Sequence, residues 1–504
     1  MDAQTFLLDL IRIKFGFMAC FHYIFIPLTL GLIASIACME TAFVRTRAKA
    51  WELAARFWFR LFVLGWVLGV VTGYPLRAQL MSDWGNYFAY VKPMLDHIVP
   101  IETAIGPLML VGVVTVAAFG SRLYPTVRMS IVWGLVVLMV LQSATILSMN
   151  AWMQHPTGAV SGAGFTQPPS LWDLFLNPMA VSKVTHVLSA ALVCGSMLIC
   201  VVSLIYLFRR THLPVARVSL RTGILLGVSS TVLVLITGHL SAEQVARYQP
   251  MKFAALEGLW EQQQGPAAWV LFAVPQPDAR VNRLEVRIPY LMSVLTGHGL
   301  SGSPPGIREV LADQEDRIRR SLRPAAANSG DLQGYRQLYA QEQAGAHGAA
   351  SESELIQRAA ARTIPNVPMR FGGFRLMALL GVGLLVAFTF GLVFRERLQS
   401  ERHRWLLCLL PCLLPLPWLA TFAGWIVAEM GRQPWAVYGY LPTFRGAQLP
   451  TLAQGVSATV AIVAVYVLLA AIFTSLAVWL IRMGPAERLP AAIETDLTAL
   501  TSPM

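Results

Sequence analysis

Ionisable side chains that interrupt long apolar stretches are the residues of this sequence best suited to chemistry. Such side chains are costly inside a membrane and by default mark a site. They are His22, Asp96, His97, Glu102, Lys183, His186, His239, Arg375 and Glu429. Imidazole is a standard axial ligand of haem iron, and carboxylates can transfer protons. Haem binding and proton transfer are therefore chemistries that this set allows.

His22 and His186 each have two interpretations. Either histidine could be an axial haem ligand or a side chain that is hydrogen-bonded to a neighbouring helix, and neither position alone decides between them. Met377 would ordinarily be a packing residue. However, His186 and Met377 begin different apolar stretches at the same expected depth. This placement would permit a six-coordinate haem b with histidine and methionine ligands.

Glu429 ends an apolar stretch, and a turn that contains Arg432 follows it. The arginine could neutralise haem propionates, although a carboxylate at such a position is often only interfacial. The histidine content excludes two familiar classes of membrane cytochrome. A haem–copper oxidase needs about six membrane histidines, and a bc-type cytochrome b needs two histidine pairs on two helices. The apolar stretches of this chain contain too few histidines for either class.

Long apolar runs must position these side chains. The chain is 56% hydrophobic and 13% charged, and about 20 apolar residues suffice to cross a bilayer as a helix. The sequence therefore predicts an all-α integral membrane protein. We expect nine transmembrane helices in a bundle, at residues 15–43, 57–75, 95–119, 127–148, 182–207, 218–240, 373–394, 405–429 and 454–481.

Basic residues recur in every second connection between these helices, from Arg45 and Arg47 after the first helix to Arg482 after the last. By the positive-inside rule, these connections and the C-terminus face the cytoplasm. The protein would then span a bacterial inner membrane, with its N-terminus in the periplasm. This orientation explains the net charge of +12 better than a nucleic-acid partner does.

The longest connection, residues 241–372, is charged and is expected to be external and partly helical. It divides the chain into helices 1 to 6 (1–240), an outer loop (241–372), and helices 7 to 9 with the cytoplasmic C-terminus (373–504). Long loops are usually functional or disordered. On this topology nearly all of the ionisable side chains lie towards the outer ends of their helices, so we expect the site near the outer face.

Several segments resemble the large subunit of cytochrome bd ubiquinol oxidases, including its cyanide-insensitive branch. They occur in family order across nearly the whole chain, at residues 21–32, 150–154, 177–186, 251–257, 374–377 and 424–435. The last segment contains Ala-Glu-Met-Gly-Arg-Gln-Pro-Trp, which is highly specific for the family.

The resemblance implies a set of haem ligands at the positions that match the family's motifs. His186 and Met377 match the ligands of a low-spin haem b. His22 and Glu429 match the axial ligands of a high-spin haem b and a haem d. Which of these two residues binds which haem stays open.

The resemblance also implies roles for residues around the haems. Lys252 and Glu257 match quinol-binding residues of the outer loop, and Glu102 matches a membrane carboxylate on the proton route to the oxygen site. Arg375 and Arg432 match positions near haem propionates.

The third predicted helix and the connection before it depart from the family. The family usually has Glu-Phe-Gln-Phe-Gly-Thr-Asn-Trp where residues 77–84 are Arg-Ala-Gln-Leu-Met-Ser-Asp-Trp. It also carries a second glutamate about two helical turns before the one that matches Glu102. That position is Met94 here, and Asp96 is the nearest acid. Asp96 is therefore a candidate replacement, and the haem d pocket is the part of the site that this departure affects most.

The function implied by the resemblance is that of a quinol:oxygen oxidoreductase. Ubiquinol or menaquinol would give up electrons at the outer loop and release protons outside. The electrons would pass through the low-spin haem to the haem pair, where dioxygen is reduced to water with cytoplasmic protons. This sidedness charges the membrane without copper or a pump. A second membrane subunit is the expected partner, and a small single-helix subunit is a further candidate.

Two other functions fit some of the same residues. One is a bd-like haem subunit with an altered oxygen pocket or a different acceptor, and the other is a solute transporter that binds its substrate with buried polar groups. Colour distinguishes them, because a transporter is colourless, a haem b protein is red, and a complete bd enzyme adds the far-red band of a chlorin.

Overall fold

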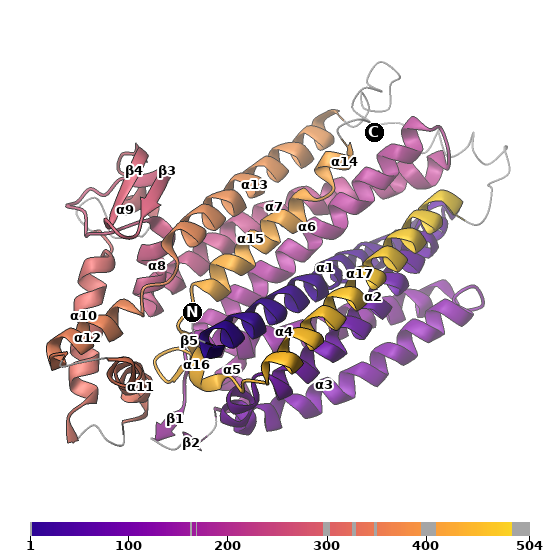
Figure 1. Cartoon of the computed structure of the whole chain (residues 1–504). Helices are drawn as coiled ribbons and strands as arrows, with labels where there is room; N and C mark the ends of the chain where they lie inside the picture. The colour runs from indigo at the N-terminus through magenta and orange to yellow at the C-terminus, as the bar shows by residue number, and fades with distance from the viewer. Residues whose placement is uncertain are drawn as a thin grey trace.

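The computed structural model describes residues 3–161, 164–167, 169–295, 303–324, 329–346, 350–394 and 410–485. Long helices form a bundle, and a smaller region of short helices and strands lies at one end of it (Figure 1). The described part contains 8 helices that are long and apolar enough to cross a membrane. They are α1 (Ala3–Thr46), α2 (Lys49–Ser82), α3 (Gly85–Phe119), α4 (Pro125–Gln154), α6 (Pro178–Phe208), α7 (Leu213–Tyr248), α13 (Val367–Phe394) and α17 (Leu452–Met483).

A shorter apolar helix, α15 (Leu416–Met430), lies in the bundle beside α13 and follows the four-residue α14 (Leu410–Leu413). These helices occupy the end of the predicted span 405–429, whose first residues lie outside the described part of the chain. The prediction of an all-helical membrane protein is confirmed. α1 begins at the end that carries the smaller region, and α17 ends at the opposite end (Figure 1).

Most spans are longer than their apolar sequence predicted. α1 begins at Ala3 where residue 15 was expected, α7 continues to Tyr248, and α13 already begins at Val367. The predicted outer loop 241–372 therefore overlaps two helices. Backbone hydrogen bonding can continue beyond the hydrocarbon layer, whereas a hydropathy window detects only the part inside it.

Close packing between α1 and α6 fixes the centre of the bundle. A Cβ atom at Gly31 would lie 2.3 Å from the carbonyl oxygen of Ala191, and one at Gly195 would lie 2.5 Å from the Gly31 backbone. Small residues of this kind let membrane helices approach closely. Because α1 carries His22 and α6 carries His186, this contact holds the two candidate ligands in a fixed relation.

The smaller region is built mainly from the segment between α7 and α13. Its helices are α8 (Pro250–Glu257), α9 (Leu291–Leu295), α10 (Ile307–Ser321), α11 (Gly330–Gly345) and α12 (Glu352–Ala361), and its hairpin pairs β3 (Trp269–Gln276) with β4 (Val281–Ile288). Buried residues such as Tyr335 and Trp435 form a core of their own there.

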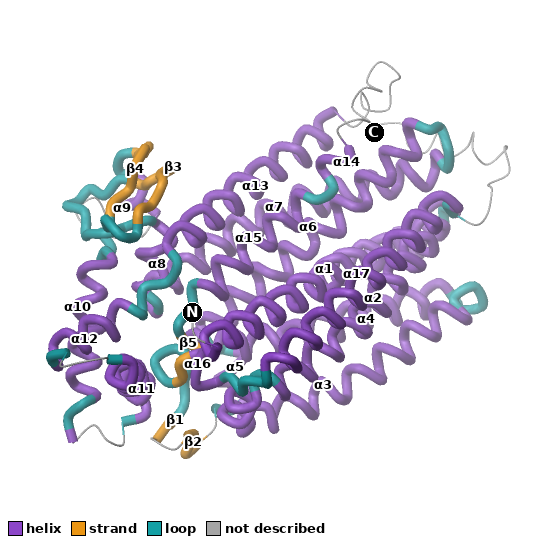
Figure 2. The backbone as a smooth tube through the Cα atoms, in the orientation of Figure 1, coloured by secondary structure: helices purple, strands orange, loops and turns teal. Residues whose placement is uncertain are grey.

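The remaining short elements lie at this end too, and the described strands form three separate two-stranded sheets (Figure 2). These elements are β1 (Ala159–Ser161), β2 (Gly164–Gln167), α5 (Leu171–Phe175), β5 (Trp435–Val437), β6 (Leu441–Pro442) and α16 (Thr443–Gly446).

Candidate functional site

A large, mostly apolar cavity of about 2060 Å³ runs between the spans and reaches the smaller region. Most of the candidate residues line it although they lie on different helices. They are His22 on α1, Glu102 on α3, His186 on α6, Lys252 and Glu257 on α8, Met377 on α13, Glu429 on α15 and, just after α15, Arg432. An apolar cavity with a few convergent polar groups is typical of a cofactor or ligand site.

The ring of His22 is oriented by α2. The Thr72 hydroxyl donates to the Leu68 carbonyl oxygen at 2.7 Å, so its oxygen is left to accept the Nδ1–H of His22 at 3.0 Å. The Nε2 atom therefore keeps its lone pair, which is the form of histidine that binds a metal. A Cβ at Gly73 would lie only 3.0 Å from the ring, so a larger residue there would crowd His22.

The same arrangement recurs at His186 with α7 in place of α2. Thr237 donates to the Leu233 carbonyl oxygen at 2.7 Å, and its hydroxyl oxygen lies 3.2 Å from His186 Nδ1. A Cβ at Gly238, the next residue, would lie 3.2 Å from the ring. Both candidate histidines thus face the same cavity with Nε2 as the free nitrogen.

Met377 packs against α15. A Cβ at Gly424 would lie 2.8 Å from the Met377 sulfur, so this glycine lets the thioether lie between α13 and α15 and still reach the cavity. A thioether sulfur is an axial haem ligand in several cytochromes.

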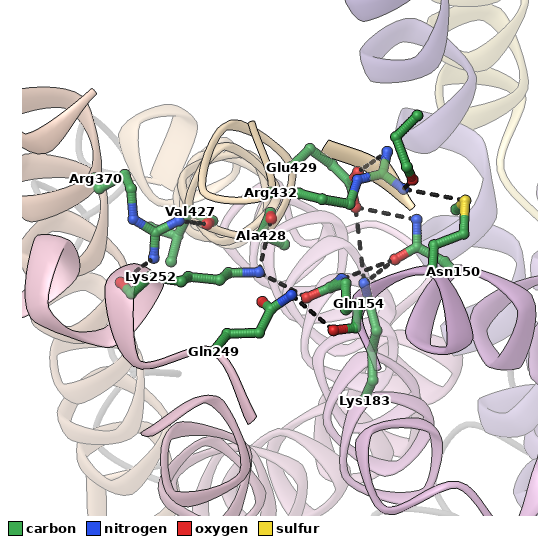
Figure 3. A network of polar contacts seen from close by, with 12 residues as sticks. Asn150, Gln154, Lys183, Gln249, Lys252, Arg370, Val427, Ala428, Glu429 and Arg432 are labelled. Atoms are coloured by element: carbon green, nitrogen blue, oxygen red, sulfur yellow. Dashed lines mark hydrogen bonds and ion pairs between the residues drawn. The ribbon is translucent and has the colours of Figure 1, made fainter. Parts of the chain in front are cut away.

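Glu429 is buried in a group of cations and amides. Its carboxylate lies 2.8 Å from Arg432 and 3.7 Å from Lys183, and it accepts a hydrogen bond from the Asn150 amide at 3.0 Å. The Lys183 ammonium also donates to the Asn150 side-chain oxygen. Figure 3 shows these side chains converging from α4, α6 and the end of α15. A carboxylate is stable in such a dry place because cations compensate it.

A chain of hydrogen bonds connects this group to Lys252. The Lys252 ammonium donates to the Gln154 side-chain oxygen at 2.6 Å and to the Ala428 carbonyl oxygen at 2.8 Å. The Gln154 amide donates to the Asn150 oxygen at 3.1 Å (Figure 3). Burial, followed by the nearby charges of Arg370 and Lys183, lowers the pKa of Lys252 well below its ordinary value. Although Lys252 was expected on an external loop, α8 buries it beside the bundle.

Glu257, at the end of α8, is held from two sides. Its carboxylate lies 2.8 Å from the Arg375 guanidinium and accepts a hydrogen bond from the Trp269 indole at 2.9 Å. Arg375 also donates to the Leu256 carbonyl oxygen and lies 4.1 Å from the centre of the Phe371 ring. Arg375, expected near haem propionates, therefore has protein partners for its donors in this structure.

The acids of α3 separate into two environments. Glu102 lines the cavity, 3.9 Å from Arg77 on α2. Asp96 pairs with Lys92 on its own helix at 2.9 Å, and its side chain is 60% exposed. Among the described residues that line the cavity, Asp96 does not occur. The structure thus brings Glu102, and not Asp96, to the candidate haem ligands.

Sequence reasoning missed three residues that hold the site together. Thr72 and Thr237 are ordinary hydroxyl residues within apolar helices, and only the pairing of helices reveals their contacts with histidine. A weak signal was present, since each is followed by glycine. Arg370 is fully buried and donates to the carbonyl oxygens of Val427 and Lys252. It lay before the predicted span and was read as part of the outer loop.

Comparison with known proteins gives consistent results. The family model described as "Cytochrome bd terminal oxidase subunit I" matches residues 10–485. The chain is 32% identical to the cytochrome bd-II ubiquinol oxidase subunit 1 of Escherichia coli, over 95% of this chain and 97% of the relative. It is 29% identical to the cytochrome bd ubiquinol oxidase subunit 1 of Bacillus subtilis, over 95% and 94%.

A solved structure, the bd oxidase from Geobacillus thermodenitrificans, has the same fold. The TM-score is 0.78 at 22% sequence identity, and the match covers 95% of this chain and 99% of the solved one. The arrangement of the spans and of the smaller region is thus one that an experimental structure also has.

Proposed function

The chain belongs to the cytochrome bd terminal oxidase subunit I family, and we propose that it is the haem-carrying subunit that oxidises quinol and reduces dioxygen to water. Membership makes it an oxidoreductase of a multi-subunit respiratory complex in a membrane. One observation carries the finer proposal. Two histidines with free Nε2 atoms face a single cavity that Lys252 and Glu257 also line.

Two further features support haem binding in this cavity. Cations outnumber carboxylates around Glu429, where Lys183, Lys252, Arg370 and Arg432 lie close together. In addition, the buried Nε atoms of Arg370 and Arg432 have no hydrogen-bond partner among the described residues. An anionic ligand would satisfy both features, and haem propionates are anions of this kind.

We assign the ligands as the family motifs imply. His186 and Met377 hold the low-spin haem b, and His22 and Glu429 hold the high-spin haem b and haem d. Arg432 balances negative charge beside them, and Arg375 acts through Glu257. When bound, haem would supply one-electron transfer and the chemistry that reduces dioxygen.

Lys252 and Glu257 bind the quinol, which is ubiquinol or menaquinol. The Glu257 carboxylate is held rigidly by Arg375 and Trp269, so it can accept a hydrogen bond from a quinol hydroxyl without reorganising. Lys252 has a lowered pKa, so it can change protonation more readily than an exposed lysine. Each quinol gives up two electrons and two protons as it becomes quinone, and four of each convert one dioxygen to two waters.

The remaining parts of the proposal concern the whole complex. The subunit spans a bacterial inner membrane with its N-terminus in the periplasm, and quinol protons leave on that side. Glu102 transfers protons towards the oxygen site from the cytoplasm, with a second membrane subunit completing the path and a small single-helix subunit as a further partner. Each charge separated across 100 mV stores about 2.3 kcal/mol.

The test is a spectrum and an oxygen electrode on the purified complex. We expect quinol to reduce low-spin haem b, a high-spin haem b and a chlorin, and to drive oxygen consumption. A colourless protein would exclude the proposal. The pairing of Glu102 with Arg77 favours one second candidate, a haem subunit with an altered oxygen pocket. In that case quinol would reduce haem b while oxygen uptake stays at background.

A further inference from the structure

The β3–β4 hairpin exposes an unusual amount of apolar side chain. Phe272 and Val286 face each other across the two strands and are 53% and 52% exposed, and Leu284 is 75% exposed. Further exposed apolar residues of the hairpin are Leu271, Val274, Val281 and Ile288. A lone two-stranded sheet is at best marginally stable in water, and a contiguous apolar patch usually marks an interaction surface.

The base of the hairpin is fixed to a membrane span. Val270 and Ala273 pack against Phe371 of α13, and the Arg375 guanidinium donates to the Val270 carbonyl oxygen at 3.2 Å. Arg375 lies about two turns inside α13. The hairpin therefore lies at the depth where a span leaves the hydrocarbon layer.

The direction of the hairpin distinguishes it from the rest of the smaller region. It projects sideways from the bundle beside the start of α13, whereas α10 and α11 lie beyond the end of the bundle (Figure 1). α13 itself exposes large apolar residues further along, including Leu379 at 70% and Val386 at 63%. An exposed apolar span faces lipid wherever no other subunit covers it, and the hairpin lies beside the start of this span.

The charges of the hairpin suit a lipid neighbour. Arg280 and Arg283 are exposed beside the apolar residues, and Tyr290 is exposed where β4 ends. Arg287 is exposed too but pairs with Glu285, and the turn carries Asp278, so the hairpin is basic by one charge. Basic side chains at a membrane surface are attracted by anionic headgroups, and tyrosine is enriched at the boundary between lipid and water. Apolar side chains with basic and aromatic neighbours are typical of a segment that lies in the membrane interface.

From these observations we propose that the β3–β4 hairpin is an interfacial anchor whose apolar side chains insert among the lipid headgroups beside α13. The hairpin begins at Trp269, which holds Glu257, so the anchor also fixes the mouth of the cavity to the lipid surface. That a lipid-borne quinol enters there rests on the proposed function, whereas the insertion of the hairpin does not.

The test uses the assembled complex in nanodiscs of phosphatidylcholine and phosphatidylglycerol. A bimane label on Leu284→Cys is compared with the same label on Asp316→Cys, an exposed position of α10. Protein without an introduced cysteine supplies the background from native thiols such as the exposed Cys412. We expect the Leu284 label to emit at shorter wavelength and to lose emission when the lipid chains carry bromine near the headgroup, while the Asp316 label does neither.

Equal emission of the Leu284 label in plain and brominated lipid would overturn the proposal. So would shielding of the label by another protein subunit, seen as short-wavelength emission that brominated lipid does not reduce. An unchanged haem spectrum verifies that each labelled complex is folded. Because quenching is measured without turnover, a complex that is quenched but oxidises no quinol would refute the proposed function and leave the anchor intact.

Discussion

Two groups of buried charges lie at opposite ends of the bundle. At the end that carries the smaller region, which we call the outer end, Glu429 contacts Arg432 and Lys183 and faces the cavity. At the opposite end, which we call the inner end, Arg128 on α4 lies 2.8 Å from Glu40 on α1 and 3.3 Å from Glu52 on α2. Among the described cavity-lining residues, none belongs to the inner group.

The difference lies in charge balance and access. In the inner group, Arg128 contacts both Glu40 and Glu52, and Glu52 also pairs with Arg56 and Lys49. Two carboxylates thus face three cations, an excess of one, where three helices meet. The outer group has a larger excess of cations beside an open space. A buried charge group that protein atoms nearly balance can be structural, whereas one that they leave unbalanced indicates a ligand.

Removing one charged side chain from each group tests this contrast with the largest expected effect. Glu429→Ala should abolish the high-spin haem signals and oxygen consumption, because it removes a proposed ligand and leaves Lys183 and Arg432 buried without their carboxylate. Glu429→Asp, which keeps the charge but is shorter by one methylene, should retain part of the haem. Haem content and oxygen uptake are measured on purified complexes.

The matched change at the inner end is Arg128→Met. Breaking a buried pair costs about 3–5 kcal/mol, so we expect a lower thermal stability with a normal haem spectrum in the protein that remains folded. If Glu429→Ala retains full haem content and turnover, the outer group is structural like the inner one, and the proposed difference between the two groups is wrong.

Substitutions of the proposed histidine and methionine ligands test which haem each residue at the outer end binds. His186→Ala or Met377→Leu should remove the low-spin haem signal and leave the high-spin signals, because six-coordinate ligation needs both axial groups. Met369→Leu is the matched control, since Met369 lies on the same helix but is exposed. A low-spin signal that persists in both site variants would refute the assignment.

The quinol residues should affect rate and not haem content. Lys252→Ala and Glu257→Ala are expected to slow quinol oxidation while the haem spectrum is unchanged, and Glu261→Ala, an exposed neighbour, should behave as wild type. Burial lowers the pKa of Lys252, so its ammonium loses its proton at a lower pH than ordinary lysine does. If a neutral Lys252 accepts a quinol proton, the wild-type rate rises with pH through this lowered pKa.

Lys252→Arg tests that pH dependence, because arginine stays protonated throughout the range. Its rate should lack the rise that the wild type has. A rate profile that is the same in both proteins would mean that Lys252 acts only as a fixed cation.

The hydroxyls behind the histidines should have a smaller effect. Thr72→Val and Thr237→Val keep the shape of the side chain but remove the acceptor for Nδ1–H. Loss of such an outer partner lowers metal affinity roughly 10–100-fold, so haem should dissociate more readily and its midpoint potential should shift. Thr72→Ser and Thr237→Ser should restore both properties. If valine and serine variants behave alike, the hydroxyls do not orient the rings.

A property could be predicted from the sequence when it depends on nearby residues, and was missed when it depends on contacts between distant segments. The spans and the family were predictable because apolar length and short motifs are local features, and both predictions are confirmed. Helix ends such as Ala3 were missed, since they lie beyond the apolar part. The burial of Arg370 and the partners of Arg375 could not be predicted, because α8, α13 and α15 create them only when they pack together.

Most of the site residues that the sequence selected come from distant parts of the chain and line one cavity. Ionisable side chains in spans are costly enough that each one retained limits the alternatives. Asp96 and Arg375 are the exceptions among the predicted site residues, since neither is among the described residues that line the cavity. For Asp96, the depth along the helix was predictable but the face on which it lies was not.

The smallest expected effect is therefore that of Asp96→Asn. Asp96 is exposed and paired with Lys92 four residues earlier, and such surface pairs contribute about 0.3–0.5 kcal/mol. Glu102, by contrast, lies at the cavity beside Arg77. We expect oxygen consumption close to wild type in Asp96→Asn and clearly reduced in Glu102→Gln, with haem content unchanged in both.

If Asp96→Asn loses as much turnover as Glu102→Gln, the exposed face of α3 carries an acid needed for oxygen reduction. A partner subunit would then have to enclose it, because a proton route needs a path shielded from bulk water. Normal turnover in Asp96→Asn would instead mean that this enzyme does not use that acid and that Glu102, with Arg77 beside it, serves an oxygen pocket built differently from the family pattern.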